Sequence, residues 1–255
     1  MFYKAIYVIV SREFKRFFRQ RGRLLTTLAR PLLWLFIVGG GLTKIIDVDA
    51  GANYLQFLLP GVMGMTILFS SVFSTISVVW DREFGFLREM LVAPVPRVTI
   101  VIGKLMAGTM LSVFQGMALL VVAPFLGITI ELVDIFYIFV VVVLISFAIT
   151  AFGLFIAARL DSLEGFNVIM NFIVLPMFFL SGALYPIDTL PQILKYVTYV
   201  NPLSYGVDAL KHLMLAGGEG ITLAAEMPIY FDVIFLSVFA VVMTTLSARA
   251  FERRG

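Results

Sequence analysis

Six long apolar runs limit the fold of this sequence more than any other feature. Each run is close to the ~20 residues that an α-helix needs to cross the hydrocarbon core of a bilayer. Hydrophobic residues make up 61% of the 255 residues, more than a soluble domain of this size can bury. We therefore predict an all-α polytopic membrane protein with one domain over residues 1–255. Its bundle, over residues 28–248, has six transmembrane helices, near 28–46, 58–80, 100–126, 134–157, 166–184 and 229–248.

Basic residues gather on one side of this predicted bundle. Of the 19 Lys and Arg, all but Lys44, Lys195 and Lys211 fall on the side that holds the two termini and the loops after the second and fourth spans. Cytoplasmic segments of membrane proteins carry the excess of Lys and Arg. The pattern predicts a multi-pass protein of the cytoplasmic (inner) membrane, with both termini and residues 81–97 in the cytoplasm.

An amphipathic helix is predicted within residues 1–23. Over residues 3–18, apolar side chains recur at helical spacing on one face and basic side chains occupy much of the other face. Such a helix lies in the membrane interface, with its basic face toward anionic headgroups. It acts either as an anchor that only fixes topology or as part of a docking surface. The apolar set is Tyr3, Ile6, Tyr7, Val10, Phe14, Phe17 and Phe18; the basic set is Lys4, Arg12, Lys15, Arg16 and Arg19.

Charged residues are nearly absent from the predicted spans. Lys104 and Asp232 lie near span edges, where we expect their charged groups to reach water. Self-powered carriers usually need buried charged groups as ion relays, so the pattern argues against such a carrier. The milder polar residues at mid-span either join helices by hydrogen bonds or line a substrate path. They are Gln115, Ser146, Thr150, Asn167 and Asn171.

The sequence carries no motif for catalysis or for cofactor binding. It has no cysteine and a single histidine, His212, which we interpret as a packed or capping residue rather than a metal ligand. It lacks the G-x-x-x-x-G-K-[ST], H-E-x-x-H and G-x-S-x-G patterns. We predict that the chain is not an enzyme, holds no metal or other cofactor and binds no nucleic acid. Any energy source must then be another chain.

The longest segment between predicted spans, residues 185–228, is external and apolar. Leu190–Val200 and Ser204–Leu215 each predict a helix too short to span a bilayer. Since unpaired backbone cannot face lipid, we predict re-entrant external helices that pack against the spans before span 6. The pair would form an outer gate or a plug that only seals. The residues that would shape it are Pro186, Pro191, Asn201 and Pro202.

Residues 81–97, DREFGFLREMLVAPVPR, form a charged segment between spans 2 and 3. A helix from Arg82 to Leu91 would present one apolar face and one aromatic and charged face. Such a helix suits packing against membrane helices on one side and a protein groove on the other. A plain connecting loop is the alternative. The candidate docking residues are Arg82, Glu83, Phe84, Gly85, Phe86, Leu87, Arg88 and Glu89.

Two stretches together carry a resemblance to a known family. EFGFLREMLVAPVPR follows span 2, and LSGALYPIDTLP with VNPLSYGVDALK follows span 5. In a chain of this length and layout, they resemble the membrane permease subunit of type-2 ABC exporters, which include exporters of daunorubicin and of nodulation factors. The resemblance covers nearly the whole chain and identifies residues 81–97 as a cytoplasmic coupling helix.

The resemblance implies a homodimer of this chain joined to two copies of a cytoplasmic ATP-binding subunit, which would bind ATP and Mg²⁺. It implies outward export of an amphipathic substrate, such as a drug-like molecule, a lipid or a lipid-linked glycan. Export of a polysaccharide or lipo-oligosaccharide, a non-transporting membrane assembly subunit and a channel or carrier working alone are the alternatives. Spans 1, 2 and 5 would border the path. The candidate path residues are Gln115, Asn167, Asn171, Phe178 and Phe179.

Overall fold

The computed structural model describes residues 2–19, 29–42, 54–85, 96–215 and 225–253, and this part of the chain is helical without any strand. Within these described ranges, four helices are long and apolar enough to cross a membrane. Two shorter apolar helices, Ala29–Gly41 and Leu163–Phe179, coincide with the predicted spans 1 and 5. The all-helical multi-pass class is confirmed, and the count of six full spans stays a prediction. The four long helices are Tyr54–Glu83, Arg97–Leu126, Leu132–Ala157 and Ile229–Phe251.

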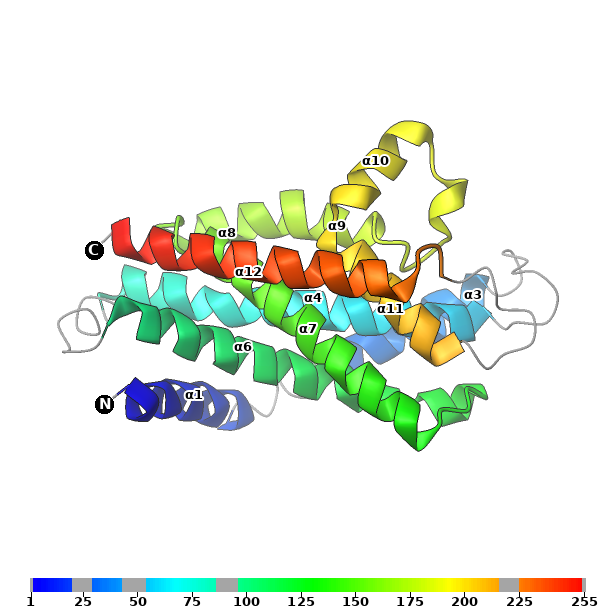
Figure 1. The fold of residues 1–255 in the computed structure, drawn as a ribbon, viewed down its shortest axis with the longest axis horizontal. Coiled ribbons are helices and arrows are strands. Elements are labelled where there is room, and N and C mark those ends of the chain that lie inside the picture. Colours follow the sequence, from blue (N-terminus) through cyan, green and yellow to red (C-terminus); the bar gives the residue numbers. More distant parts are fainter. Residues whose placement is uncertain (1, 20–28, 43–53, 86–95, 216–224, 254–255) are drawn as a thin grey trace.

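These helices form an elongated bundle (Figure 1). The helices α4 (Tyr54–Glu83), α6 (Arg97–Leu120), α7 (Leu132–Ala157) and α12 (Ile229–Arg253) run along its long axis. The short helix η2 (Ala123–Leu126) extends α6. Span 5 is a composite of α8 (Leu163–Ile169), the π-helix η3 (Met170–Val174) and α9 (Leu175–Phe179). The helix of residues 29–41 likewise contains a π-helix, η1 (Trp34–Val38), and its last turn is α3 (Gly39–Leu42).

Helix α4 is the central element of the core. It is buried over most of its length because α6, α7 and α11 pack against it. Small residues also allow the segment after α9 to approach α4 closely: a Cβ added to Gly61 would lie 2.2 Å from the carbonyl oxygen of Ala183. Hydroxyl groups also join the helices, since the Oγ atoms of Ser71 on α4 and Ser112 on α6 lie 2.8 Å apart. Hydrogen bonds between helices are therefore present, but they do not come from the side chains predicted to make them. The hydroxyls of Ser146 and Thr150 have no hydrogen-bond partner among the described residues.

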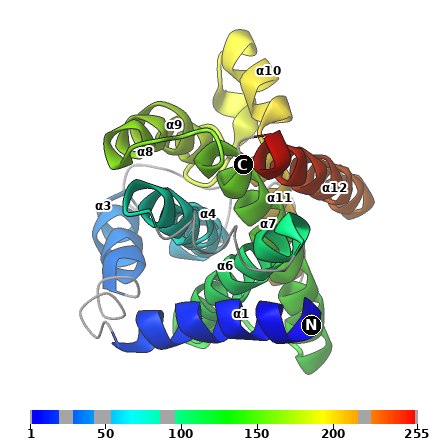
Figure 2. The same cartoon turned by 90° about the vertical axis from the view of Figure 1, so that its left-hand side faces the viewer.

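Helix α1 (Phe2–Arg19) lies across one end of the bundle (Figure 2). Its orientation is the one expected of an interfacial helix. The side chains that it buries are Ile9, Glu13 and Phe17, which follow one another at i, i+4 and i+8. Ile9 packs against Gly103 of α6. Tyr3 and Tyr7, from the predicted apolar face, are 84% and 73% exposed, so they stay available for lipid.

Two helices of the segment before α12 differ in their packing. Helix α11 (Pro202–Leu215) is almost wholly buried against α4, α7 and α12. Helix α10 (Gln192–Val200) projects sideways from the bundle and exposes most of its side chains (Figure 1). The short η4 (Ile187–Thr189) precedes it. The expectation that both helices pack against the spans is correct for α11 and wrong for α10. Their re-entrant place in a bilayer stays a prediction.

The predicted helix from Arg82 to Leu91 is wrong at its start. Arg82 and Glu83 are the last residues of α4, and the chain turns at Gly85, whose φ is +79°. The N–H of Phe84 donates to the Trp80 carbonyl at 3.0 Å and that of Gly85 to the Arg82 carbonyl at 3.1 Å. A glycine in the left-handed region is a frequent helix terminator because it has no Cβ to clash. Residues 86–95 lie outside the described residues.

Candidate functional site

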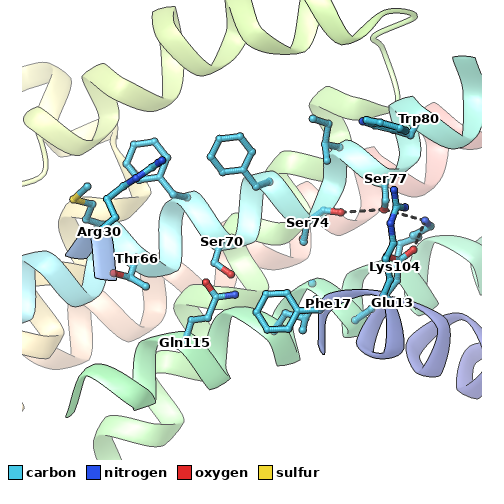
Figure 3. Close-up of a pocket in the computed structure, with 18 of the residues that line it drawn as sticks. Glu13, Phe17, Arg30, Thr66, Ser70, Ser74, Ser77, Trp80, Lys104 and Gln115 are labelled. Atoms are coloured by element: carbon cyan, nitrogen blue, oxygen red, sulfur yellow. Dashed lines mark hydrogen bonds and ion pairs between the residues drawn. The ribbon is translucent and has the colours of Figure 1, made fainter. Parts of the chain in front are cut away.

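A cavity of about 490 Å³ lies between α1, the start of the helix of residues 29–41, α4 and α6 (Figure 3). One side of α4 supplies most of its wall. Hydroxyl side chains recur along this side at spacings of four, four and three residues, so they share one helix face. Aromatic side chains form a neighbouring row. The hydroxyl row is Thr66, Ser70, Ser74 and Ser77, and the aromatic row is Phe69, Phe73 and Trp80.

The two rows give the cavity an amphipathic lining. An apolar or aromatic group can pack on the rings, while polar groups can pair with the hydroxyls. Gln115 of α6 adds an amide whose Oε1 is buried without a hydrogen-bond partner among the described residues. Figure 3 shows Arg30 beside Thr66 at one end of the cavity, at mid-length of α4. A basic group therefore lies further along the bundle than we expected from predicted spans with almost no charged residues.

A buried cluster of charges closes the other end of the cavity. The Nζ of Lys104 on α6 donates to Glu13 Oε1 at 2.8 Å, to Asp81 Oδ2 at 2.7 Å and to Ser77 Oγ at 2.9 Å. Arg12 of α1 reaches Glu13 and Asp81, at 3.1 Å each. We call these five residues the ionic cluster. Because its members come from α1, α4 and α6, it joins these three helices where α4 leads into residues 81–97.

The charges of the ionic cluster support one another. Burial alone would raise the pKa of Glu13, but the cations Lys104 and Arg12 outweigh burial and lower this pKa below its usual range. Glu13 is therefore ionised at neutral pH. The pKa of Arg12 is raised, because Asp81 and Glu13 together outweigh its burial. The expectation that Lys104 reaches water is wrong, since only 3% of its side chain is exposed. Asp232 is also fully buried.

Four of the eight predicted docking residues are described. Arg82 is engaged within its own chain, since its guanidinium donates to the Leu160 carbonyl at 2.6 Å and lies 3.3 Å from Asp161. Glu83 is exposed, and Phe84 is 69% exposed. The Phe84 ring lies 5.4 Å from that of Trp80. An exposed aromatic pair beside a carboxylate is typical of a protein contact surface. Phe86, Leu87, Arg88 and Glu89 lie outside the described residues.

The predicted path residues fall into three places. Gln115 lines the cavity. Phe178 is buried, and its ring meets Trp34 of span 1 and Phe69 of α4 at 6.4 and 6.5 Å. Spans 1, 2 and 5 thus meet through aromatic rings. The remaining three residues lie on an exposed face of α8, η3 and α9, where the Asn171 amide donates to the Asn167 carbonyl at 2.9 Å. That face carries Asn167, Asn171 and Phe179.

The predicted gate residues shape the segment before α12 through its backbone. Pro186 and Pro191 precede η4 and α10, and Pro202 begins α11, the positions where proline suits a helix start. Asn201 is buried at the junction of α10 and α11. Its amide donates to the Met177 carbonyl at 2.7 Å, and its Oδ1 accepts the Leu203 N–H at 3.1 Å. Asn201 thereby joins the junction to the end of α9.

Several residues of the cavity and the ionic cluster were not predicted as site residues, although the sequence indicates some of them. Glu13 is the only acidic residue in α1, and it stands on the buried stripe. The hydroxyl row of α4 repeats at helical spacing and leads to Asp81, so a polar stripe along one apolar span was visible. Lys104 was visible as a charge within a predicted span. No local pattern indicated that Arg30 lies at the cavity.

The fold and the cavity define a class of protein: a multi-pass membrane protein with an amphipathic cavity between its helices. Comparison with known proteins narrows this class. Residues 4–215 match the family described as ABC-2 type transporter. The chain belongs to this family, as the membrane permease of such a transporter, and the family implies an ATP-binding partner.

Several known proteins are similar to most of the chain. The transport permease ycf38 of Cyanophora paradoxa is 31% identical over 222 residues, which cover 83% of this chain and 74% of that protein. Nodulation protein J of Rhizobium meliloti is 31% identical over 194 residues, covering 75% and 74%. Nodulation protein J of Rhizobium leguminosarum bv. viciae is 28% identical over 233 residues, covering 91% and 87%. The resemblance found in the sequence is confirmed.

Proposed function

We propose that this chain is the membrane permease subunit of an ATP-driven exporter that moves an amphipathic substrate outward across the cytoplasmic membrane. The single observation that supports this most is the cavity, because its aromatic and hydroxyl rows fit a molecule with both apolar and polar parts. The basic Arg16 and Arg30 in its lining favour substrates that carry an anionic group.

The energy would come from two copies of an ATP-binding subunit, which hold ATP and Mg²⁺. They would dock on the cytoplasmic segment after α4, where Glu83 and Phe84 are exposed. The ionic cluster lies at the base of this segment and joins α4 to α1 and α6. Closure of the ATP-binding subunits would therefore move three walls of the cavity together, through contacts that are already in place.

A homodimer is the assembly that suits the exposed face of α8 and α9. Asn167 and Asn171 are exposed there, on a helix at membrane depth. A lipid-facing amide is costly because lipid tails offer no hydrogen bonds. A second copy of the chain would cover these amides, and the covered groove would continue the substrate path. The candidate path residues on this face would then line the contact between the two copies.

A lipid-linked polysaccharide or lipo-oligosaccharide is the second candidate substrate. Aromatic rings beside hydroxyl groups are the combination that suits sugars, which present apolar faces and polar edges. The cavity offers this combination over the length of α4 from Thr66 to Trp80.

The test is the ATPase response of the purified transporter. The chain is reconstituted in nanodiscs with its ATP-binding subunit, and ATP hydrolysis is measured across a panel of anionic amphiphiles, neutral amphiphiles and lipid-linked sugars. We expect stimulation by at least one class, and Phe69→Ala or Phe73→Ala should raise the concentration needed about tenfold. Phe139→Ala, on the exposed side of α7, is the control. No response to any class would contradict export and favour a non-transporting assembly subunit.

A further inference from the structure

Three metal-ligating side chains meet at the end of the bundle opposite α1. Asp208 and His212 lie one turn apart on α11, and Asp232 lies in the first turn of α12. One ligand atom from each lies within 4.8 Å of the other two. The His212 Nε2 lies 3.8 Å from Asp208 Oδ2. None of these residues belongs to the cavity or to the ionic cluster.

Among the residues that the structure describes, none explains the burial of the Asp232 carboxylate as its partner. The residue is 0% exposed, and neither of its carboxylate oxygens has a hydrogen bond among the described residues. An unpaired buried carboxylate is strongly unfavourable. Lys211 is the nearby cation of α11, but its Nζ donates to the Gly182 carbonyl at 2.8 Å and lies 4.1 Å from the Phe57 ring centre. A charged Asp232 would therefore require another positive group, whereas a protonated Asp232 would not.

Asp208 is held in place by the chain that precedes α12. Its Oδ1 accepts the N–H of Glu226 at 2.8 Å, and its Oδ2 accepts the N–H of Met227 at 2.9 Å. The His212 Nε2 also contacts the Met227 carbonyl oxygen. Each carboxylate oxygen keeps a second lone pair, which can bind a cation. Hydrogen bonds of this kind orient ligands before a metal binds.

We propose that Asp208, His212 and Asp232 bind a divalent transition-metal cation. Two carboxylates balance the two positive charges, and an imidazole beside carboxylates favours Mn²⁺, Fe²⁺ or Zn²⁺ over the oxygen-only sites of Ca²⁺ and Mg²⁺. The Met227 carbonyl oxygen contacts the His212 Nε2 while this nitrogen carries a proton, and it becomes a fourth ligand atom when the metal replaces that proton. The His212 side chain is 32% exposed, which leaves a route for entry. The metal ties α11 to the start of α12 and so fixes the buried half of the external segment.

To test the proposal, the full chain in detergent is first treated with a chelator to remove bound metal and is then loaded with Mn²⁺. We expect about one Mn²⁺ per chain to remain after desalting. Pulsed EPR should detect a nitrogen coupling from the imidazole of His212. Asp232→Asn should weaken Mn²⁺ binding about 100-fold, and His212→Gln should abolish the nitrogen coupling. Asp188→Asn, an exposed carboxylate of the same external segment, is the control that should bind as the wild type does.

Thermal unfolding separates a metal site from a general effect of the cation. Mn²⁺ should raise the unfolding temperature of the wild type and of Asp188→Asn, and should leave that of Asp232→Asn unchanged. An equal rise in all three would overturn the proposal. If Asp232→Asn does not fold, the wild type and His212→Gln decide, because a wild type that loses all Mn²⁺ on desalting or shows no nitrogen coupling overturns the proposal as well.

Discussion

At the scale of single residues, the positions of α1, α4 and α6 depend on buried charges that are paired with opposite charges. Lys104 lies between two carboxylates, Glu13 and Asp81, and each of them also meets Arg12. A buried pair of opposite charges adds little stability by itself, whereas removal of one partner leaves an uncompensated buried charge. The cluster therefore fixes the relative positions of α1, α4 and α6 more than it strengthens the fold.

Removal of the central cation tests this interpretation. Lys104→Met leaves Glu13 and Asp81 in a buried site with only Arg12 nearby, and should lower the free energy of unfolding by about 3–5 kcal/mol. Adding Glu13→Gln to Lys104→Met should recover part of the loss, because it removes one of the stranded charges. Lys4→Met, which changes an exposed lysine of α1, is the control and should change the stability little. Chemical unfolding in detergent measures all four proteins.

The lowered pKa of Glu13 predicts a pH dependence of stability. A carboxyl group with a lowered pKa in the folded state stabilises the protein above its unfolded pKa and loses this contribution as the pH falls through its folded pKa. Stability should therefore decline as the pH falls below the ordinary glutamate value of 4.5. The decline should be shallower in Glu13→Gln. Unfolding temperatures of both proteins across this pH range measure it, and identical slopes would contradict the assignment.

At the scale of helices, the sequence predicts which segments are helical better than it predicts their contacts. The apolar runs locate α4, α6, α7 and α12, because hydrophobicity over ~20 residues is a property of the run itself. The break at Asn201 and Pro202 locates the junction of α10 and α11. Which of these two helices is buried depends on packing against distant helices, and their similar apolar composition does not show it.

The spacing of residues in the sequence predicts one part of the candidate site, the hydroxyl row, but not the ionic cluster. The hydroxyl row of α4 is a periodic pattern, so the sequence contains it. The ionic cluster joins residues 12, 13, 77, 81 and 104, whose proximity depends on how α1 lies against α6. The sequence pattern predicts a helix that continues through Gly85, but the chain turns there with a left-handed φ. The sequence could not show this turn, because a glycine can adopt either a helical or a left-handed conformation.

Close packing of α4 against the segment after α9 should be sensitive to one methyl group. In Gly61→Ala the new Cβ would lie 2.2 Å from the backbone oxygen of Ala183, which cannot move like a flexible side chain. We expect a loss of about 1–3 kcal/mol in the free energy of unfolding. Gly165→Ala, where the nearest atoms lie at 3.4 Å, is the matched control. Equal stability of the two variants would show that α4 and this segment are packed differently.

The exposed end of α4 should contribute to docking without contributing to folding. Glu83→Ala combined with Phe84→Ala removes two exposed side chains, so the unfolding temperature should stay near that of the wild type. Association with the ATP-binding subunit should weaken about tenfold, because exposed aromatic anchors carry much of the energy of an interface. Glu164→Ala, an exposed carboxylate in the first turn of α8, is the control. Full retention of the subunit by the double variant contradicts docking at this site.

At the scale of the whole molecule, helix α4 connects the cavity with the residues proposed for docking. It forms much of the cavity wall along its length, and the exposed Glu83 and Phe84 lie at its end. The ionic cluster lies between them and extends the same connection to α1 and α6. At the opposite end, α11 fills the space between α4, α7 and α12. Movement of the residues proposed for docking would therefore be transmitted to the cavity wall through α4 and the ionic cluster.

Transport through the cavity is the central claim, and export by reconstituted transporter measures it most directly. Proteoliposomes containing the chain and its ATP-binding subunit are given a fluorescent anionic amphiphile on the side of the ATP-binding subunit. We predict ATP-dependent movement to the opposite side by the wild type and by Val241→Trp, which alters an exposed face of α12. Ser70→Trp, which fills the cavity, should stop movement while the ATP-binding subunit stays bound. Movement by Ser70→Trp at the wild-type rate would contradict the claim.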